Sequence, residues 1–247
     1  MAFWWGLISP GLLPGLSHLT DFILALPVLV FSLVAHEYAH GYAAYLQGDD
    51  TAYMLGRLTF NPIPHIDPVL SVLMPALLFI ASGHKFAFGG AKPIPVVTRK
   101  FRNFRRGDLI VSSAGVATNL VLSLLFTVLF AGLGIAGRLA PAAIPALDVA
   151  QRMAVWGIQL NLILCFFNLI PIPPLDGSRI LYHFLPAEWG LRYRSLERYG
   201  FVIIAGLMFF VQPLFLWLLT PAGWMLQVLI NLVVPGFAVG DGWNIFS

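Results

Sequence analysis

Hydrophobic residues along this chain are gathered into long runs that are separated by short polar stretches. Five runs are long enough for a helix that crosses a bilayer, which takes about 20 residues. They cover residues 20–46, 108–137, 153–172, 201–219 and 222–239. A sixth run, residues 69–82, is shorter and is interrupted by Pro75. Because runs of that length are more often re-entrant than spanning, we expect an all-α polytopic membrane protein with about five transmembrane helices and one short re-entrant segment.

Composition supports this class of protein. Of the 247 residues, 59% are hydrophobic and 10% are charged, against roughly 25% charged residues in soluble domains. No internal repeat and no appended soluble domain is visible, so we expect a single membrane-embedded domain over residues 1–247. No Lys or Arg precedes Arg57, so we expect no cleavable signal peptide, whose first part is basic. The single cysteine, Cys165, excludes an intrachain disulfide.

The net charge of +3 comes from basic residues that adjoin the hydrophobic runs. The cluster from Arg99 to Arg106 also contains Phe101 and Phe104, which suit insertion at a membrane interface better than base stacking. Membrane lipids and the positive-inside rule explain this charge. We therefore expect lipid head groups as partners and no nucleic acid.

One polar motif lies inside the first hydrophobic run. His36-Glu37-Tyr38-Ala39-His40 reads H-E-x-x-H. On a helix, positions i and i+4 share a face, so both imidazoles can bind one metal ion while the glutamate acts as a base. Ionisable side chains at membrane depth are costly and need a partner, and a bound metal ion supplies one. A polar packing cluster or a proton relay is the alternative interpretation.

A third metal ligand must come from elsewhere in the chain. The extended zincin pattern requires histidine at position 46, where this chain has Leu46. The best candidate is Asp176, which follows Pro171, Pro173 and Pro174 at the end of the third run and precedes Gly177. The prolines end the helix, and the glycine allows a tight turn. Taken alone, Asp176 could equally cap the next helix.

The metal site fixes a topology that charge counting leaves open. If residues 69–82 re-enter, Lys and Arg divide twelve to two between the two sides of the membrane; if they span, eleven to three. Both divisions satisfy the positive-inside rule. His36 and His40 lie about 9 to 15 Å below the end of the first run at 1.5 Å per residue. Asp176 follows the end of the third run, which lies on the basic side of the membrane. His36 and His40 can meet Asp176 only if the first run also ends on that side, and this requires residues 69–82 to re-enter. Residues 47–107 are then cytoplasmic and the N-terminus is outside.

These residues carry a family resemblance. H-E-x-x-H in one transmembrane helix, with Asn168-Leu169-Ile170-Pro171-Ile172-Pro173-Pro174-Leu175-Asp176-Gly177 later, resembles the site-2 protease family of intramembrane zinc metalloproteases. Residues 56–62, 65–68 and 91–95 are similar to its compact prokaryotic members. The resemblance covers roughly residues 20–200 and implies a three-helix catalytic core. It also implies one Zn²⁺ held by His36, His40 and Asp176, with Glu37 as general base.

A further element of the family resembles Ala114-Gly115-Val116-Ala117-Thr118-Asn119, with Val116 in place of the usual proline. Asn119 could hold the substrate backbone or a developing oxyanion, or it could make interhelical hydrogen bonds. The same two interpretations apply to Asn168. His65 and Asp67 lie in a loop, where we expect solvent contact or support of another ligand rather than zinc binding.

We therefore expect an intramembrane zinc metalloendopeptidase in the cell membrane, with its active site facing the cytoplasm. Its substrate would be a transmembrane segment of another protein. The catalytic core would cover about residues 20–180, with accessory helices over about 200–240. A metal-dependent transporter or ion pathway is the main alternative, although transporters commonly show repeated halves. A catalytically silent adaptor is a third, which would not need Glu37.

Overall fold

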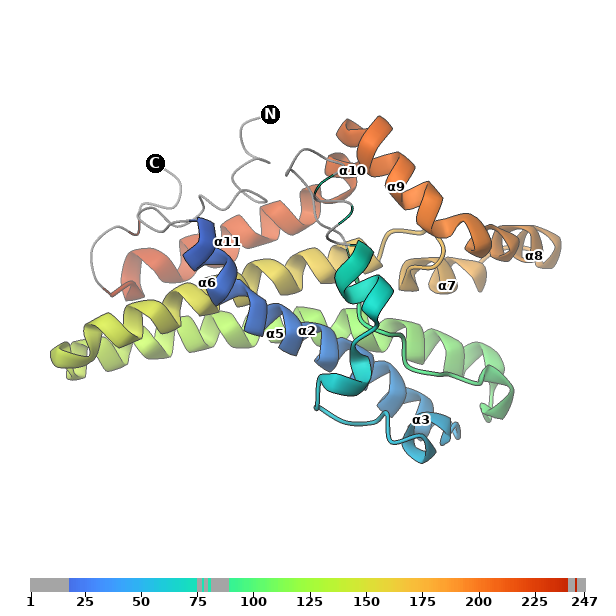
Figure 1. Cartoon of the computed structure of the whole chain (residues 1–247), viewed down its shortest axis with the longest axis horizontal. Coiled ribbons are helices and arrows are strands. Elements are labelled where there is room, and N and C mark those ends of the chain that lie inside the picture. The colour runs from blue at the N-terminus through green and yellow to red at the C-terminus, as the bar shows by residue number, and fades with distance from the viewer. Residues whose placement is uncertain (1–17, 75–76, 78–79, 81–88, 240–242, 244–247) are drawn as a thin grey trace. The chain divides into compact units, whose positions relative to one another are not determined.

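A computed structural model describes residues 18–74, 77, 80, 89–239 and 243 (Figure 1). Its α-helices are α2 (His18–Leu46), α3 (Thr51–Met54), α5 (Phe104–Leu139), α6 (Ile144–Asn168), α7 (Asp176–Tyr182), α8 (Ala187–Arg194), α9 (Gly200–Phe210), α10 (Gln212–Leu218) and α11 (Thr220–Phe237). Short 3₁₀ segments are η1 (Ile63–His65), η3 (Thr98–Lys100), η4 (Pro141–Ala143) and η5 (Ser195–Tyr199), and η2 (Pro68–Leu73) is a π-helix. The described ranges contain no strand, as the predicted all-α class requires.

Four helical stretches are long and apolar enough to cross a membrane. They are Ile23–Leu46, Phe104–Leu139, Pro141–Asn168 and Thr220–Phe237. A broken pair, Ala187–Phe210 with Gln212–Leu218, meets the same criteria when it is taken together. The polytopic class predicted from the sequence is therefore confirmed. Part of the predicted re-entrant segment 69–82, namely residues 75, 76, 78, 79, 81 and 82, lies outside the described residues; its beginning belongs to η2.

The predicted third span began at residue 153, which was too late. In the structure α6 begins at Ile144 and includes Asp148, Gln151 and Arg152. These polar residues have partners inside the protein: the Arg152 guanidinium donates to the Asp148 carboxylate over 2.8 Å, and the Gln151 amide donates to the Phe130 carbonyl over 3.0 Å. Because each of these side chains has a partner within the protein, the helix continues through them.

The predicted span 201–219 is two helices rather than one. The helical stretch Ala187–Phe210, which ends with α9, and α10 are bent by 107° at a break beside Val211. Pro213 lies in the first turn of α10, and a proline there cannot donate to the carbonyl four residues earlier and its ring clashes with that carbonyl. A helix that began at Gly200 therefore has to end before Pro213. The hydrophobic run alone did not reveal this break.

The described residues form two compact units. The first comprises Met1–Ser32, Asn119–Phe166 and Leu216–Ser247, and the second comprises Leu33–Thr118 and Phe167–Phe215. The single membrane domain expected from the sequence stays a prediction, and the two units are described separately.

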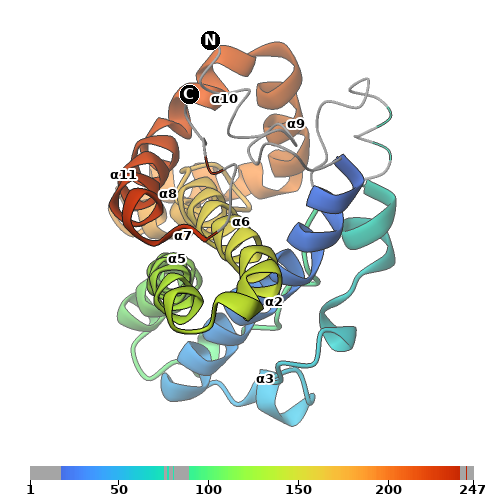
Figure 2. The ribbon, with the colours of Figure 1, turned by 90° about the vertical axis from the view of Figure 1, so that its left-hand side faces the viewer.

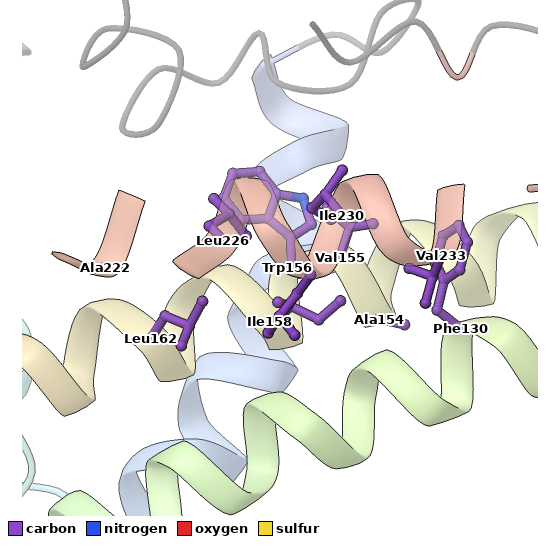
Figure 3. Packing of buried hydrophobic residues seen from close by; sticks show 11 residues of the cluster. Phe130, Ala154, Val155, Trp156, Ile158, Leu162, Ala222, Leu226, Ile230 and Val233 are labelled. Carbon is purple, nitrogen blue, oxygen red and sulfur yellow. The ribbon is translucent and has the colours of Figure 1, made fainter. Parts of the chain in front are cut away.

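The first unit has an apolar core between α5, α6 and α11 (Figure 3). Its central side chains are Phe130, Ile158, Leu162, Leu226 and Ile230, all of them 2% exposed or less. Figure 3 shows that α6 and α11 contribute most of the cluster, which buries the face that each helix turns toward the other. In water, burying such side chains contributes about 1.5–3 kcal/mol each to stability. In lipid, helix association is instead stabilised by close van der Waals packing of these side chains.

A buried polar network also joins three helices of the first unit. The Asn161 amide on α6 donates to Ser32 Oγ on α2 over 2.8 Å and to the Gly157 carbonyl over 2.8 Å. The Asn119 amide on α5 donates to Asn161 Oδ1 over 2.9 Å. Ser32, Asn119 and Asn161 are fully buried. Hydrogen bonds between apolar helices fix which faces meet, because a rotated helix would leave these groups without partners.

The second unit contains the end of α2, the beginning of α5 and the short helices from α7 to α9. A small core forms where Ala43 and Ala44 of α2 meet Phe101 and Val111. In Figures 1 and 2, α7 and α8 lie beside each other. Tyr182 packs closely against Gly190, and the Arg194 guanidinium lies 5.1 Å from the centre of its ring. These contacts fix α7, the helix on which Asp176 is the first residue.

Candidate metal centre

Two imidazoles lie one above the other near the C-terminal end of α2. His36 and His40 are one helical turn apart, so their side chains point to the same side of the helix. Their ring centres are 4.6 Å apart and their Nε2 atoms are 3.0 Å apart. Both side chains are buried, with 6% and 8% of their surface exposed. The H-E-x-x-H motif therefore forms the paired arrangement that its spacing predicts.

Asp176 reaches these imidazoles from a proline-rich turn. The chain leaves α6 at Asn168 and turns through residues 169–175. Helix α7 then begins at Asp176 with Leu175 as its N-cap, and no side chain makes a capping hydrogen bond. The simple capping role is therefore not what the structure shows. Gly177 is needed for close approach, because a Cβ there would lie 2.2 Å from the Leu169 carbonyl oxygen; its φ is not positive, in contrast to the tight-turn role expected.

The three predicted ligand atoms converge on one point. Asp176 Oδ2 lies 3.4 Å from His36 Nε2 and 3.2 Å from His40 Nε2. In a tetrahedral zinc site with ligand distances of about 2.0–2.1 Å, ligand atoms are about 3.3 Å apart. The observed triangle, with sides of 3.0 to 3.4 Å, matches that separation. Among the described residues, these three form the one group of His, Cys, Asp and Glu side chains that meets the requirements of a metal site.

The hydrogen bonding of the candidate ligand atoms also suits a cation. Asp176 Oδ2 is buried, and no donor points at it with hydrogen-bond geometry. His40 Nδ1 lies 2.7 Å from the Val111 carbonyl, which can only accept. Nδ1 must therefore carry the hydrogen, and in the neutral ring Nε2 keeps a lone pair for a metal ion. The residues present fit a zinc ion on these observations.

The ionisation of Asp176 agrees with a ligand role. Burial by itself would raise the pKa of this carboxyl, but the imidazoles of His36 and His40 outweigh burial and hold the pKa below its usual range. The side chain is therefore a carboxylate at neutral pH, as metal binding requires.

Helix α5 passes directly beside the imidazoles at Gly115. A Cβ at this position would lie 2.4 Å from His40 Nε2 and 2.5 Å from His36 Cε1. Real Cβ atoms do not come that close, so the helix can approach the metal ligands only with glycine here. The sequence resemblance included Gly115, but only the coordinates show what its missing side chain makes room for.

Glu37 lies on the same turn of α2 and is held by a separate segment. Its Oε2 accepts a hydrogen bond of 2.8 Å from the backbone N–H of Ile94. Glu37 is half-buried, and no partner for its Oε1 is found among the described residues. The structure therefore places the Glu37 carboxylate next to the predicted metal ligand His36, with one oxygen held by Ile94.

The other predicted site residues are placed differently. Asn119 belongs to the buried polar network of the first unit, where its amide donates to Asn161. Asn168 is the last residue of α6 and is half-buried. Their roles as substrate contacts stay predictions. His65 is buried, its Nε2 lies 3.0 Å from the Thr59 carbonyl, and Asp67 accepts from the Val69 N–H; neither belongs to the group of metal ligands.

Sequence reasoning missed a buried pair that supports α7. His183 follows the last residue of α7, and its Nε2 lies 2.8 Å from Asp108 Oδ2 on α5. Both side chains are almost fully buried, and the Arg105 guanidinium donates to the His183 carbonyl over 3.1 Å. The pair ties the end of α7 to α5, which also carries Gly115. No motif marks this contact, because Asp108 and His183 are 75 residues apart.

The amino-acid sequence of this chain is similar to those of known proteins. The profile of "Peptidase family M50" matches residues 135–213, which include Asp176. "Putative zinc metalloprotease YwhC" of Bacillus subtilis (strain 168) is 40% identical over 193 residues, which cover 78% of this chain and 82% of that protein. The chain belongs to peptidase family M50. The resemblance to site-2 proteases seen in the sequence is thus confirmed.

Mycobacterial members of the M50 family are also similar. "Putative zinc metalloprotease Rip2" of Mycolicibacterium smegmatis is 32% identical over 197 residues, covering 78% of this chain and 69% of that protein. The protein of that name from Mycobacterium tuberculosis (strain H37Rv) is 28% identical over 234 residues, covering 94% and 85%. No solved structure matches the chain. Membership of the M50 family, together with the names of these relatives, supports a metalloprotease as the functional class of this chain.

Proposed function

We propose that this chain is an intramembrane zinc endopeptidase that hydrolyses a peptide bond in or near a transmembrane segment of another membrane protein. The proposal rests on one observation: His36, His40 and Asp176 converge on one point. Glu37 lies between the two histidines on α2. The M50 membership supports proteolysis, and the names of the relatives support zinc. Neither the family nor the geometry favours the alternative, a metal transporter.

The chain's own residues would divide the work of hydrolysis. His36, His40 and Asp176 would hold the ion and leave a fourth position open, as in catalytic zinc sites. A bound zinc ion would activate water at neutral pH and polarise the scissile carbonyl. Glu37 would take a proton from the attacking water and deliver it to the leaving amine nitrogen. For that step its carboxylate must be ionised and held still.

The membrane position of the site follows from the same residues. His36 and His40 lie within Ile23–Leu46, a stretch that can cross a membrane, and near its C-terminal end. The basic residues that follow this helix, such as Arg57 and Arg99, favour the cytoplasmic side by the positive-inside rule. The site would therefore lie a few helical turns below the cytoplasmic surface of the cell membrane, where it would meet a substrate helix that has begun to unwind.

An extended substrate needs backbone partners, and the segment Ala91–Val97 is the candidate. It has no helical or strand assignment. The Val97 N–H is already used, since it donates to Asp49 Oδ2 over 2.6 Å. The Val96 N–H has no partner among the described residues. It is thus free to pair with a substrate strand.

Val96→Pro removes this free donor and is expected to raise KM for a transmembrane substrate about tenfold, because one backbone hydrogen bond is lost. The measurement is cleavage of a model transmembrane peptide in detergent at varied substrate concentration. Val97→Pro is a poorer probe, because it would also break the bond to Asp49. Unaltered KM in Val96→Pro would count against this edge.

The proposed activity is tested by purifying the protein in detergent, measuring its zinc content and assaying cleavage of a model transmembrane peptide. Glu37→Gln keeps the shape of the side chain but removes the base. We expect about one zinc per chain in both proteins and a fall in kcat of about 10²- to 10⁴-fold in the variant. Equal cleavage by the two proteins would refute Glu37 as the base, and absence of zinc from the wild type would refute the metal site.

A further inference from the structure

We infer that the segment Ala91–Val97, here called the strap, positions the catalytic carboxylate of Glu37 through the backbone N–H of Ile94. Ile94 is thus a positioning residue that acts by its amide and not by its side-chain chemistry. The inference rests on the proposed function in giving Glu37 the role of base. It goes further in assigning the orientation of that base to a backbone amide of another segment.

The strap crosses α2 at the turn that carries Glu37. The Ile94 N–H donates to Glu37 Oε2 over 2.8 Å, and the Ile94 side chain is 7% exposed. Its Cδ1 lies so close to Gly41 that a Cβ at position 41 would approach it to 2.3 Å. Gly41 is four residues beyond Glu37 on the same face of the helix. The isoleucine side chain therefore fits a notch in α2 beside the carboxylate that its amide holds.

Contacts on both sides of Ile94 fix the strap against the rest of the second unit. On the N-terminal side, the Lys92 N–H donates to the His65 carbonyl over 2.7 Å, and the Arg57 guanidinium donates to the Lys92 carbonyl over 3.0 Å. On the C-terminal side, the Val97 N–H donates to the buried carboxylate of Asp49 over 2.6 Å. His65 and Arg57 therefore help to hold the strap, a role that the sequence did not reveal.

The local sequence leaves one backbone N–H that can hold the Glu37 carboxylate. Pro93 and Pro95 flank Ile94 and have no N–H, and a residue before proline is held in an extended conformation. The Ile94 N–H therefore stands alone between two positions that cannot donate, on a backbone that is already stiff. A backbone donor moves less than a side-chain donor and has no charge to gain or lose. It can hold Oε2 in place while Oε1 remains available for proton transfer.

The hydrogen bond can be tested without any cleavage assay. Amide hydrogen exchange at Ile94 is measured in the wild type and in Glu37→Ala, with exchange at Val97 as the internal reference. We expect exchange at Ile94 to be about tenfold faster in Glu37→Ala, because a bond to a charged acceptor is lost, while Val97 keeps its rate. Equal exchange at Ile94 in the two proteins would overturn the inference even if the protein is an active protease.

The consequence for catalysis is tested by a matched pair of substitutions. Ile94→Pro removes the N–H, whereas Ile94→Ala keeps it and shortens the side chain. For the model transmembrane peptide, we expect kcat of Ile94→Pro to be at least about tenfold below that of Ile94→Ala, since a misplaced base costs up to about 10²-fold. KM and zinc content should agree between the two. Equal kcat values would overturn the inference, whereas a wild type that cleaves nothing would count against the proposed function.

Discussion

Asp176→Ala is expected to purify without its zinc ion and to show no cleavage above background. In the proposed site the carboxylate would supply one of three ligand atoms, and its Oδ2 lies within 3.4 Å of the Nε2 atoms of both imidazoles. Loss of a residue that merely supports a ligand costs about 10- to 100-fold in metal affinity, so loss of a ligand itself should cost more than about 100-fold. Metal analysis after gel filtration, together with the peptide assay, measures both effects.

Glu188→Ala is the matched control for this substitution. Like Asp176, Glu188 is an acidic residue in the first turn of a short helix. Unlike Asp176, it is exposed. Both substitutions remove a favourable interaction with a helix N-terminus, about 0.3–1 kcal/mol, but only Asp176→Ala removes a proposed metal ligand. Full zinc content and activity in Asp176→Ala would contradict the three-ligand site.

Gly115→Ala is the second substitution with a large expected effect, although it adds a single methyl group. That group would lie 2.4 Å from His40 Nε2, the atom proposed to bind the metal, and 2.7 Å from His36 Nδ1. Either the imidazoles or α5 must move, and a displacement of about 1 Å costs on the order of 10²-fold in rate. We expect zinc affinity and kcat both to fall by about that factor, as measured by titration with a chelator and by the peptide assay.

Gly132→Ala on the same helix separates this effect from helix propensity. Nothing lies within 4 Å of a Cβ at Gly132, and both substitutions gain about 1 kcal/mol of helix propensity. Gly132→Ala should therefore keep its zinc and its activity and be as stable as the wild type or more so. If Gly115→Ala behaves like Gly132→Ala, the close approach of α5 to the imidazoles is wrong.

The sequence alone predicted that His36, His40 and Asp176 come together, because their chemistry is visible locally. His36 and His40 stand at helical spacing in an apolar run, where an unpaired imidazole is costly. The prolines before Asp176 mark a helix end. The cost of burying charged groups without partners predicts that Asp176 pairs with the two histidines. The polytopic class was predictable for a similar reason, since a bilayer sets the length of its helices.

What the sequence did not reveal depends on contacts between distant residues. The hold of Ile94 on Glu37 runs through a backbone amide, which has the same chemistry in every residue but proline. Gly115 matters for what it leaves out, and its neighbours come from another helix. The start of α6 was misplaced because Arg152 looks like a boundary until Asp148 is seen beside it.

The order in which the ligands occur along the chain has a consequence for synthesis. His36 and His40 are made early, whereas Asp176 follows 136 residues after His40. A nascent chain that has inserted its first helix already carries the H-E-x-x-H motif, but it lacks the carboxylate that completes the triangle with the two imidazoles. The ribosome must therefore deliver helices α5 and α6 before the ion can be held by all three ligands. Under the proposed function, a chain that ends before Asp176 would lack the complete metal site and would therefore be inactive.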